Sequence, residues 1–529
     1  MADDRLSALD ATFLQGEDEA TNTTVGGAEV FVGSPPSLDE FRDSIERRLD
    51  ELPNFRRKLA TVPLGLGRPR WIDDDAFDLD YHVRHTALPS PSGSPQLQEL
   101  LGRLFGQHMS RDRPLWELWL VEGLADGRFA MVHRMHHALV DGIASINVLE
   151  TLLDAEPEPA DGSGGDEWRP QPGPSTARLL ADAAFERALP PELARSLFRA
   201  VRSPRRTAGD AARTVAGAAG LARAAASPAP PSPYNAPVGP HRRLSWQRES
   251  LDDLKAMKNA LSGSLNDVVL AGVAGALGRH LRRRGEDTAG MELFAFVPVS
   301  VRGGDDDDEA GGNEVSGLKV PLPVGADDPE ERFRRVSEAM DELKESAQVD
   351  GAKAMIEATG LAPYGVLERL SGVAYLQRFV NLVVTNVPGP QQALYLRGRP
   401  LEDIFPFVPL GGNLGLGVVI VSYLDRITFG FSGDADIVPD LDELPGDLHA
   451  SFAELAELTG VELTEPAPEG RPSVGSTGEP WPGYDEQTLA ELRPQIERLD
   501  AEGLEGVRAY ERAHKDRAGV RQAVDRHTG

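Results

Sequence analysis

The stretch Met131-Val-His-Arg-Met-His-His-Ala-Leu-Val-Asp-Gly142 carries the most concentrated chemistry in the chain. His133, His136 and His137 lie within it, although the whole sequence of 529 residues has only 11 histidines. A strand-like segment leads into the histidine pair, and residues 143–153 follow with a helix-like pattern. We therefore expect the pair on a turn at the C-terminal end of a strand, where α/β proteins often place their sites.

Three roles are open to these histidines. They could be structural residues that bond to the backbone. They could bind zinc, although the stretch lacks the His-Glu-x-x-His spacing and the chain has no cysteine to help. They could also provide a general base, because imidazole transfers protons near neutral pH. The pair followed by Asp141-Gly142 favours the base, with Asp141 holding the turn rigid or balancing a nearby cation.

Strand-like and helix-like patterns alternate in the surrounding chain. Residues 116–124 and 128–135 predict two strands joined by an Asp-Gly turn, and residues 28–32 predict another strand. Residues 37–52 predict a helix, since they open with a Ser-Leu-Asp-Glu capping pattern. This mixture predicts an α/β fold in which helices pack on sheets.

Composition divides the chain into four parts. Residues 1–155 form a first α/β lobe that contains the histidine turn. Residues 156–240 are rich in Pro, Ala and Arg, and we predict a crossover linker with helices in it. Residues 241–465 predict a second α/β lobe, and residues 466–529 predict a helical extension to which the sequence assigns no role.

The second lobe has a clear set of expected elements. Residues 264–284 predict a long helix. The expected strands are residues 292–301, 316–323, 379–387, 418–424 and 427–431.

Charge and composition exclude several classes of protein. With 55 Lys and Arg against 84 Asp and Glu, the net charge of −29 argues against a nucleic-acid binder. The absence of cysteine excludes disulfides, thiolate metal sites and a Cys nucleophile. We see neither a secretory signal nor an apolar run long enough to span a bilayer, and expect a cytoplasmic protein. The Arg-rich residues 187–223 either form a solvated helix face or attract an anionic membrane or substrate phosphates.

A family resemblance follows from the histidine stretch. His136-His137-Ala-Leu-Val-Asp141-Gly142 resembles the His-His-x-x-x-Asp-Gly signature of the CoA-dependent acyltransferase superfamily, which includes chloramphenicol acetyltransferase and peptide-synthetase condensation domains. Further motifs are similar to the bacterial wax ester synthase/diacylglycerol acyltransferase family, in that family's order. They are Leu6-Ser-Ala-Leu-Asp-Ala-Thr-Phe13, Phe77-Asp-Leu-Asp-Tyr-His82, Arg113-Pro-Leu-Trp-Glu117, Asn266-Asp267-Val-Val-Leu270, Pro298-Val-Ser-Val-Arg302, Gly312-Asn313, Asn386-Val-Pro-Gly-Pro390 and Ser422-Tyr423. The long crossover and residues 466–529 depart from the family pattern.

The resemblance implies a fold and an activity. The fold would be two chloramphenicol-acetyltransferase-like lobes of mixed sheet with flanking helices and an active-site channel between them. The activity would be O-acyl transfer from fatty acyl-CoA to diacylglycerol, giving triacylglycerol, or to a long-chain alcohol, giving wax ester. Acyl-CoA is a substrate, and no cofactor or metal is implied. The water-insoluble acceptors lead us to expect peripheral contact with membranes or lipid droplets, and the sequence indicates no oligomeric state.

Two other functions compete with this one. The chain could be a condensation-type acyltransferase that uses a carrier-protein thioester. It could also be a non-catalytic lipid-binding module.

The resemblance also suggests roles for single residues. His137 would be the general base, and His136 would support the turn. Asp141 would be a structural partner of an arginine, with Arg56 as the first candidate and Arg302 as the second, and Gly142 would be structural.

Three residues outside the histidine turn are further candidates. Asn266 could donate to the reaction's oxyanion or simply cap a helix. Trp116 could line the substrate pocket or lie in the core. Asn386 would contribute to substrate binding, and the stretch Asn386-Val-Pro-Gly-Pro390 would be a loop or turn that shapes the domain interface. His133 receives no role.

Overall fold

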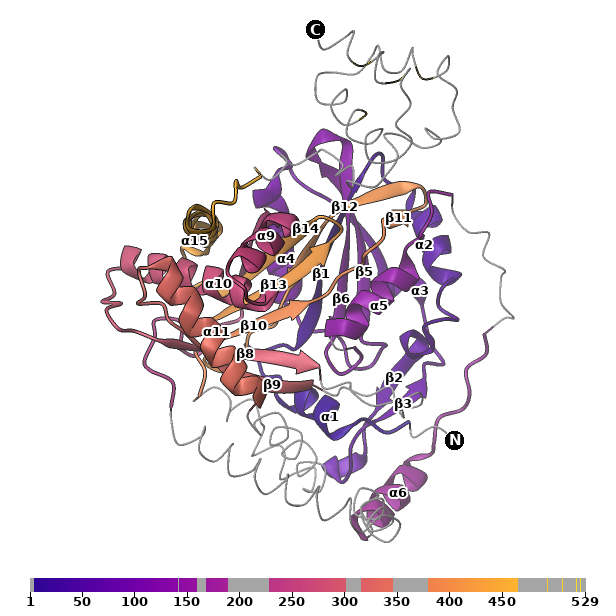
Figure 1. Ribbon diagram of the computed structural model, residues 1–529. Helices are drawn as coiled ribbons and strands as arrows, with labels where there is room; N and C mark the ends of the chain where they lie inside the picture. The colour runs from indigo at the N-terminus through magenta and orange to yellow at the C-terminus, as the bar shows by residue number, and fades with distance from the viewer. Residues whose placement is uncertain are drawn as a thin grey trace, which may run out of the picture. The chain divides into compact units, whose positions relative to one another are not determined.

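A computed structural model describes residues 4–140, 142–158, 168–188, 228–300, 315–345 and 379–464, together with four single positions beyond residue 466 (Figure 1). The chain divides into two compact units, Met1–Pro466 and Ala467–Gly529. The four described positions of the second unit are helical and buried, in agreement with the predicted helical extension: Leu492, Val507, Val520 and Val524. The other elements that the structure describes belong to the first unit.

The first unit contains two six-stranded mixed sheets, as the α/β prediction required. In spatial order, the first sheet consists of β11 (Tyr395–Leu396), β12 (Arg399–Phe407), β1 (Thr24–Val32), β6 (Arg128–His136), β5 (Trp116–Leu124) and β4 (Val83–Ala87). In this sheet β4 and β5 are parallel and the other neighbours are antiparallel. The predicted hairpin is present as β5 and β6, joined by a short 3-10 turn at Ala125–Gly127. Residues 28–32 lie within β1.

The first sheet includes strands from distant parts of the sequence. β12 pairs along β1 in antiparallel register, from Gly26 opposite Phe407 to Phe31 opposite Leu401. β12 was not predicted, because two prolines and two acidic residues interrupt its apolar pattern. The histidine-bearing sheet is therefore completed by residues that follow the crossover by more than 150 positions.

The second sheet holds all five strands predicted for the second lobe. In spatial order it consists of β7 (Arg242–Ser250), β14 (Arg426–Asp434), β13 (Leu416–Tyr423), β10 (Leu382–Val387), β8 (Leu293–Ser300) and β9 (Val315–Leu322). β10 runs parallel to both β8 and β13, and the remaining pairs are antiparallel. β7 is an additional strand that the sequence did not reveal.

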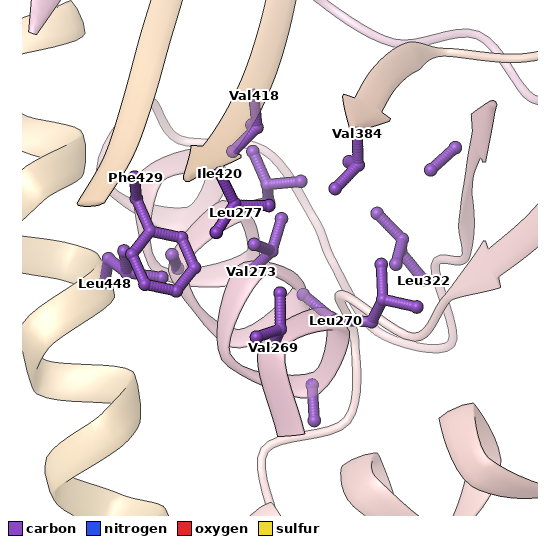
Figure 2. Packing of buried hydrophobic residues seen from close by; sticks show 14 of the residues in the cluster. Val269, Leu270, Val273, Leu277, Leu322, Val384, Val418, Ile420, Phe429 and Leu448 are labelled. Carbon is purple, nitrogen blue, oxygen red and sulfur yellow. The ribbon is translucent and has the colours of Figure 1, made fainter. Parts of the chain in front are cut away.

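The predicted long helix is α10 (Leu265–Arg283), which packs on the second sheet. It begins with a capping box, in which Ser264 and Asp267 each bind the other's backbone N–H. Val273 and Leu277 of α10 lie against Ile420 of β13 in Figure 2, and all three are buried. The other helices that the structure describes around this core are α9 (Leu251–Ala260), α11 (Pro329–Glu345) and α15 (Leu444–Thr459).

Other helices cover the first sheet or lie in the connections. They are α1 (Ala8–Gln15), α2 (Leu38–Glu46), α3 (Leu79–His82), α4 (Ser94–Phe105), α5 (Gly142–Leu152) and α6 (Thr176–Ala188). The helix predicted over residues 37–52 ends early, because the chain after Glu46 tightens into turns with i to i+3 hydrogen bonds, such as Arg48 N–H to Ile45 O. Most of the Arg-rich stretch 187–223 lies outside the described residues.

In the part of the chain that the structure describes, no single helix is long and apolar enough to cross a bilayer. Only α9 and α10 taken together reach the required length and composition, as a pair bent by 102°.

Candidate active site

The histidine pair lies where the sequence analysis placed it, at the end of a strand. β6 ends at His136, and α5 begins at Gly142. Backbone bonds continue into the turn: the N–H of His136 donates to Leu115 O at 3.0 Å, and that of His137 donates to Thr23 O at 2.9 Å. Asp141 lies outside the described residues.

His136 is a fixed, buried anchor of this turn. Its Nδ1 accepts a hydrogen bond from Ala138 N–H at 2.9 Å, so its ring proton belongs on Nε2. That Nε2 lies 3.1 Å from both Glu17 Oε1 and Thr23 Oγ1. With 1% of its surface exposed, His136 ties the turn to the segment before β1.

Glu17 completes the anchor, although nothing in the sequence predicted this role. Its Oε1 accepts from Thr23 N–H at 2.9 Å, and its Oε2 lies 2.7 Å from the Arg111 guanidinium. Burial alone would raise the pKa of Glu17, but His136, Arg111 and Thr23 outweigh it and lower the pKa to about 2. The carboxylate therefore stays ionised near neutral pH. No local pattern marks Glu17, since it is one of several acids in a polar segment.

Phe13 fixes the plane of the proposed base. The rings of Phe13 and His137 are stacked, with centroids 3.9 Å apart and 17° between their planes. Phe13 belongs to α1, whose N-cap Ser7 accepts from Asp10 N–H. The fold thus brings two of the resemblance motifs, residues 6–13 and 136–142, into direct contact.

Trp116 is buried beside the turn, with 1% of its surface exposed. It opens β5 opposite Met135 of β6. Its indole N–H donates to Phe55 O at 2.7 Å, and its ring stacks on His82 with centroids 4.5 Å apart. Burial lowers the pKa of His82, which favours a neutral ring there. These contacts place Trp116 in the core beneath the turn, and its role toward substrate stays a prediction.

Asn266 and Asn386 come together although 120 residues separate them. Asn386, near the end of β10, donates from Nδ2 to Asn266 Oδ1 at 2.7 Å. Asn266 itself is not the cap of α10, because Ser264 is the N-cap and Asp267, the second residue of the Asn-Asp pair, completes the capping box. The Asn266 amide is therefore oriented by Asn386.

The structure describes only one of the two arginines expected to pair with Asp141. Arg56 lies 2.5 Å from Asp50 Oδ1 and 5.3 Å from the centroid of the Trp168 ring. Arg302 lies outside the described residues, as does Asp141. The pairing of Asp141 with an arginine accordingly stays a prediction. Among the residues that the structure describes, no three His, Asp or Glu side chains are grouped to hold a metal ion.

Comparison with known proteins decides the family. The sequence model of the wax ester synthase/diacylglycerol acyltransferase catalytic domain matches residues 6–269, and that of the family's C-terminal domain matches residues 311–456. The chain belongs to the wax ester synthase/diacylglycerol acyltransferase family. Residues beyond 456 lie outside both matches, as the sequence analysis expected of the extension.

Individual relatives support this family assignment. A Mycobacterium tuberculosis protein with the name "probable diacyglycerol O-acyltransferase tgs2" is 34% identical over 474 residues, which cover 87% of this chain and 100% of that protein. Another from the same species, "probable diacyglycerol O-acyltransferase tgs1", is 31% identical over 463 residues, covering 86% of this chain and 96% of that protein.

Solved structures share the fold. The wax ester synthase/diacylglycerol acyltransferase from Marinobacter aquaeolei VT8 has a TM-score of 0.62 and 25% identity, covering 86% of this chain and 99% of that one. The first condensation domain of the calcium-dependent antibiotic synthetase has a TM-score of 0.53 and 17% identity, covering 87% of this chain and 97% of that one. This likeness confirms the expected acyltransferase-type fold.

Proposed function

We propose that this protein transfers a fatty acyl group from acyl-CoA to diacylglycerol, to a long-chain alcohol, or to both, with His137 as general base. Triacylglycerol is the preferred product, since the two mycobacterial relatives are named for diacylglycerol. The observation that carries the proposal is the set of contacts that fix the position of His137. Its ring is stacked on Phe13, while its neighbour His136 is locked to Glu17.

In the proposed reaction the His137 imidazole takes the proton of the acceptor hydroxyl. The alkoxide oxygen forms a bond to the thioester carbonyl carbon, and a tetrahedral oxyanion results. Collapse of this intermediate breaks the carbon–sulfur bond, and the CoA thiolate receives the proton from His137. A single residue acts as base and then as acid, so no acyl-enzyme is required.

Asn266 is our candidate donor to the oxyanion. Its side chain lies at the N-terminal end of α10, where the helix dipole also favours negative charge. The bond from Asn386 fixes the Asn266 amide through its oxygen, which frees the amide N–H groups for a developing charge. Trp116, which opens β5 opposite Met135, supports the strand that leads into the turn, and Asp141 remains our candidate for a structural partner of an arginine.

The insoluble acceptors require the protein to meet a lipid surface. We propose a cytoplasmic protein that contacts membranes or lipid inclusions peripherally. The chemistry needs no cofactor beyond the CoA that arrives with the acyl group.

The test is product analysis with labelled palmitoyl-CoA, offered diacylglycerol and hexadecanol in competition. We expect labelled triacylglycerol, wax ester or both from the wild type, and none above background from His137→Ala. If neither acceptor gives labelled neutral lipid, the acyl-CoA reaction is rejected. A carrier-protein thioester would then be the acyl donor to test. Undiminished product from His137→Ala would reject the base assignment.

A further inference from the structure

Three buried polar side chains from three elements form a chain of contacts next to the catalytic turn, called here the Glu29–His133–Ser145 chain. Glu29 lies on β1, His133 on β6 and Ser145 in the first turn of α5. His133 Nδ1 lies 2.9 Å from Glu29 Oε1, and His133 Nε2 lies 3.2 Å from Ser145 Oγ. The exposed fractions are 0%, 5% and 7% in the same order.

This chain is unusual for the interior of a lobe. Among the described residues, neither oxygen of Glu29 accepts an aligned hydrogen bond, so the contact with His133 is the partner that the structure gives the carboxylate. Burial of a carboxylate with so little compensation is costly, and apolar side chains of similar volume would fill the space without that cost. Such a chain is therefore a candidate for a functional role.

His133 connects the other two residues. Its Nδ1 lies close to Glu29 Oε1 without an aligned hydrogen bond, and its Nε2 shares a hydrogen bond with Ser145 Oγ in which the donor depends on the tautomer of the ring. These contacts join β1 and β6 to the first turn of α5.

The contact between His133 and Ser145 matters because these two residues lie on either side of the catalytic turn. His133, on β6, precedes His137 by four positions, and Ser145 follows His137 by eight. Thr23, Glu17 and Phe13 hold the strand side of this turn, through the contacts to His136 and His137 described above. The bond between Ser145 and His133 holds the helix side.

We propose that Glu29, His133 and Ser145 are positioning residues for the acyl-transfer reaction. They dock the first turn of α5 so that the segment after β6 presents the His137 imidazole to the acceptor hydroxyl. This inference rests on the proposed role of His137. Small displacements of a catalytic group reduce turnover strongly while the substrates still bind.

The test compares Ser145→Ala with two matched variants by steady-state kinetics. Ser145→Thr keeps the hydroxyl, and Thr151→Ala removes a half-buried hydroxyl near the C-terminal end of the same helix, where it donates to the helix carbonyl of Asn147. We expect kcat to fall about tenfold or more in Ser145→Ala, with KM for acyl-CoA and Tm near wild type. Ser145→Thr should recover most of the loss, and Thr151→Ala should be unaffected.

A second measurement tests the chain as a unit. Glu29→Gln keeps the side-chain shape and removes the charge, and we expect it to lower kcat as well. The double variant Glu29→Gln, Ser145→Ala should lose no more than the worse single variant, because both changes break the same chain. If the reductions in kcat of the two single variants multiply in the double variant, the proposal is contradicted.

Other results would also overturn it. Unchanged kcat in Ser145→Ala would show that the bond has no role in turnover. A fall in Tm with parallel changes in kcat and KM would show a purely structural role. Covalent labelling of Ser145 by a fluorophosphonate would show that the serine is itself a nucleophile. If His137→Ala is inactive while Ser145→Ala is fully active, the positioning proposal alone fails; an active His137→Ala refutes the base itself.

Discussion

Glu17 and His136 form a buried contact across the active-site turn, with Glu17 Oε1 at 3.1 Å from His136 Nε2. The contact joins the segment before β1 to the last residue of β6. Because His137 is the next residue, any movement of His136 is passed directly to the proposed base. The pair therefore links the stability of the turn to the ionisation of one carboxylate.

Replacement of Glu17 by Gln should destabilise the fold in a pH-dependent manner. The folded pKa of about 2 lies below the ordinary glutamate value of about 4.3, so the ionised form stabilises the protein above that ordinary value. The advantage is lost as the pH falls through about 2. We expect a loss of about 2–3 kcal/mol at pH 7 that shrinks below pH 4. Urea unfolding across this range measures it, and Glu19→Gln at an exposed position is the control.

Loss of the Phe13 ring should slow turnover. The stack with His137 is of a kind that contributes about 0.5–1.5 kcal/mol, so Phe13→Leu should reduce kcat by up to about tenfold. Phe13→Tyr retains the ring and should stay close to wild type. Equal kcat in both variants would show that the stack does not orient the base.

Asn266 and Asn386 should behave as a coupled pair. Each single change to Ala should lower kcat, and the pair should show a coupling energy of about 1 kcal/mol in a double-mutant cycle. The physical reason is that Asn386 acts through the orientation of the Asn266 amide. Additive losses would mean that the two side chains serve separate steps.

Asp403 should be critical for stability. Its side chain is 1% exposed on β12 and lies 3.0 Å from Arg426 and 2.9 Å from Arg248, both on strands of the second sheet. Asp403→Ala would leave two arginines without this carboxylate, and we expect a loss of about 3–5 kcal/mol in the free energy of unfolding. Asp442→Ala, which removes an exposed partner of Arg243, should cost under about 1 kcal/mol. Denaturant unfolding compares the two variants, and similar losses would contradict the expectation.

The sequence predicts elements whose pattern is local. The β5–β6 hairpin and α10 have strong apolar patterns with clear turn or capping residues, and both are present. β12 was missed because its acids, Glu402 and Asp403, resemble surface residues until their partners are known. Those partners, Arg128 and Arg426 among them, come from other strands, and only the fold brings them within reach.

The candidate site also has a part that the sequence predicts and a part that it does not. The histidine pair was visible from residue type and spacing alone. The stack of Phe13 on His137 and the chain from Glu29 to Ser145 depend on contacts between distant segments. A single acidic residue in a polar stretch, such as Glu17, carries no mark of its eventual burial.

The position of β12 in the first sheet has a consequence for biosynthesis. A nascent chain can form β1, β5 and β6 early, but the edge of β1 that β12 occupies stays open until residue 407 has been made. An open strand edge is a template for pairing with other chains. Ribosome pausing within the crossover, or truncation before β12, should therefore favour aggregation, and the histidine-bearing lobe should resist isolation as a separate soluble fragment.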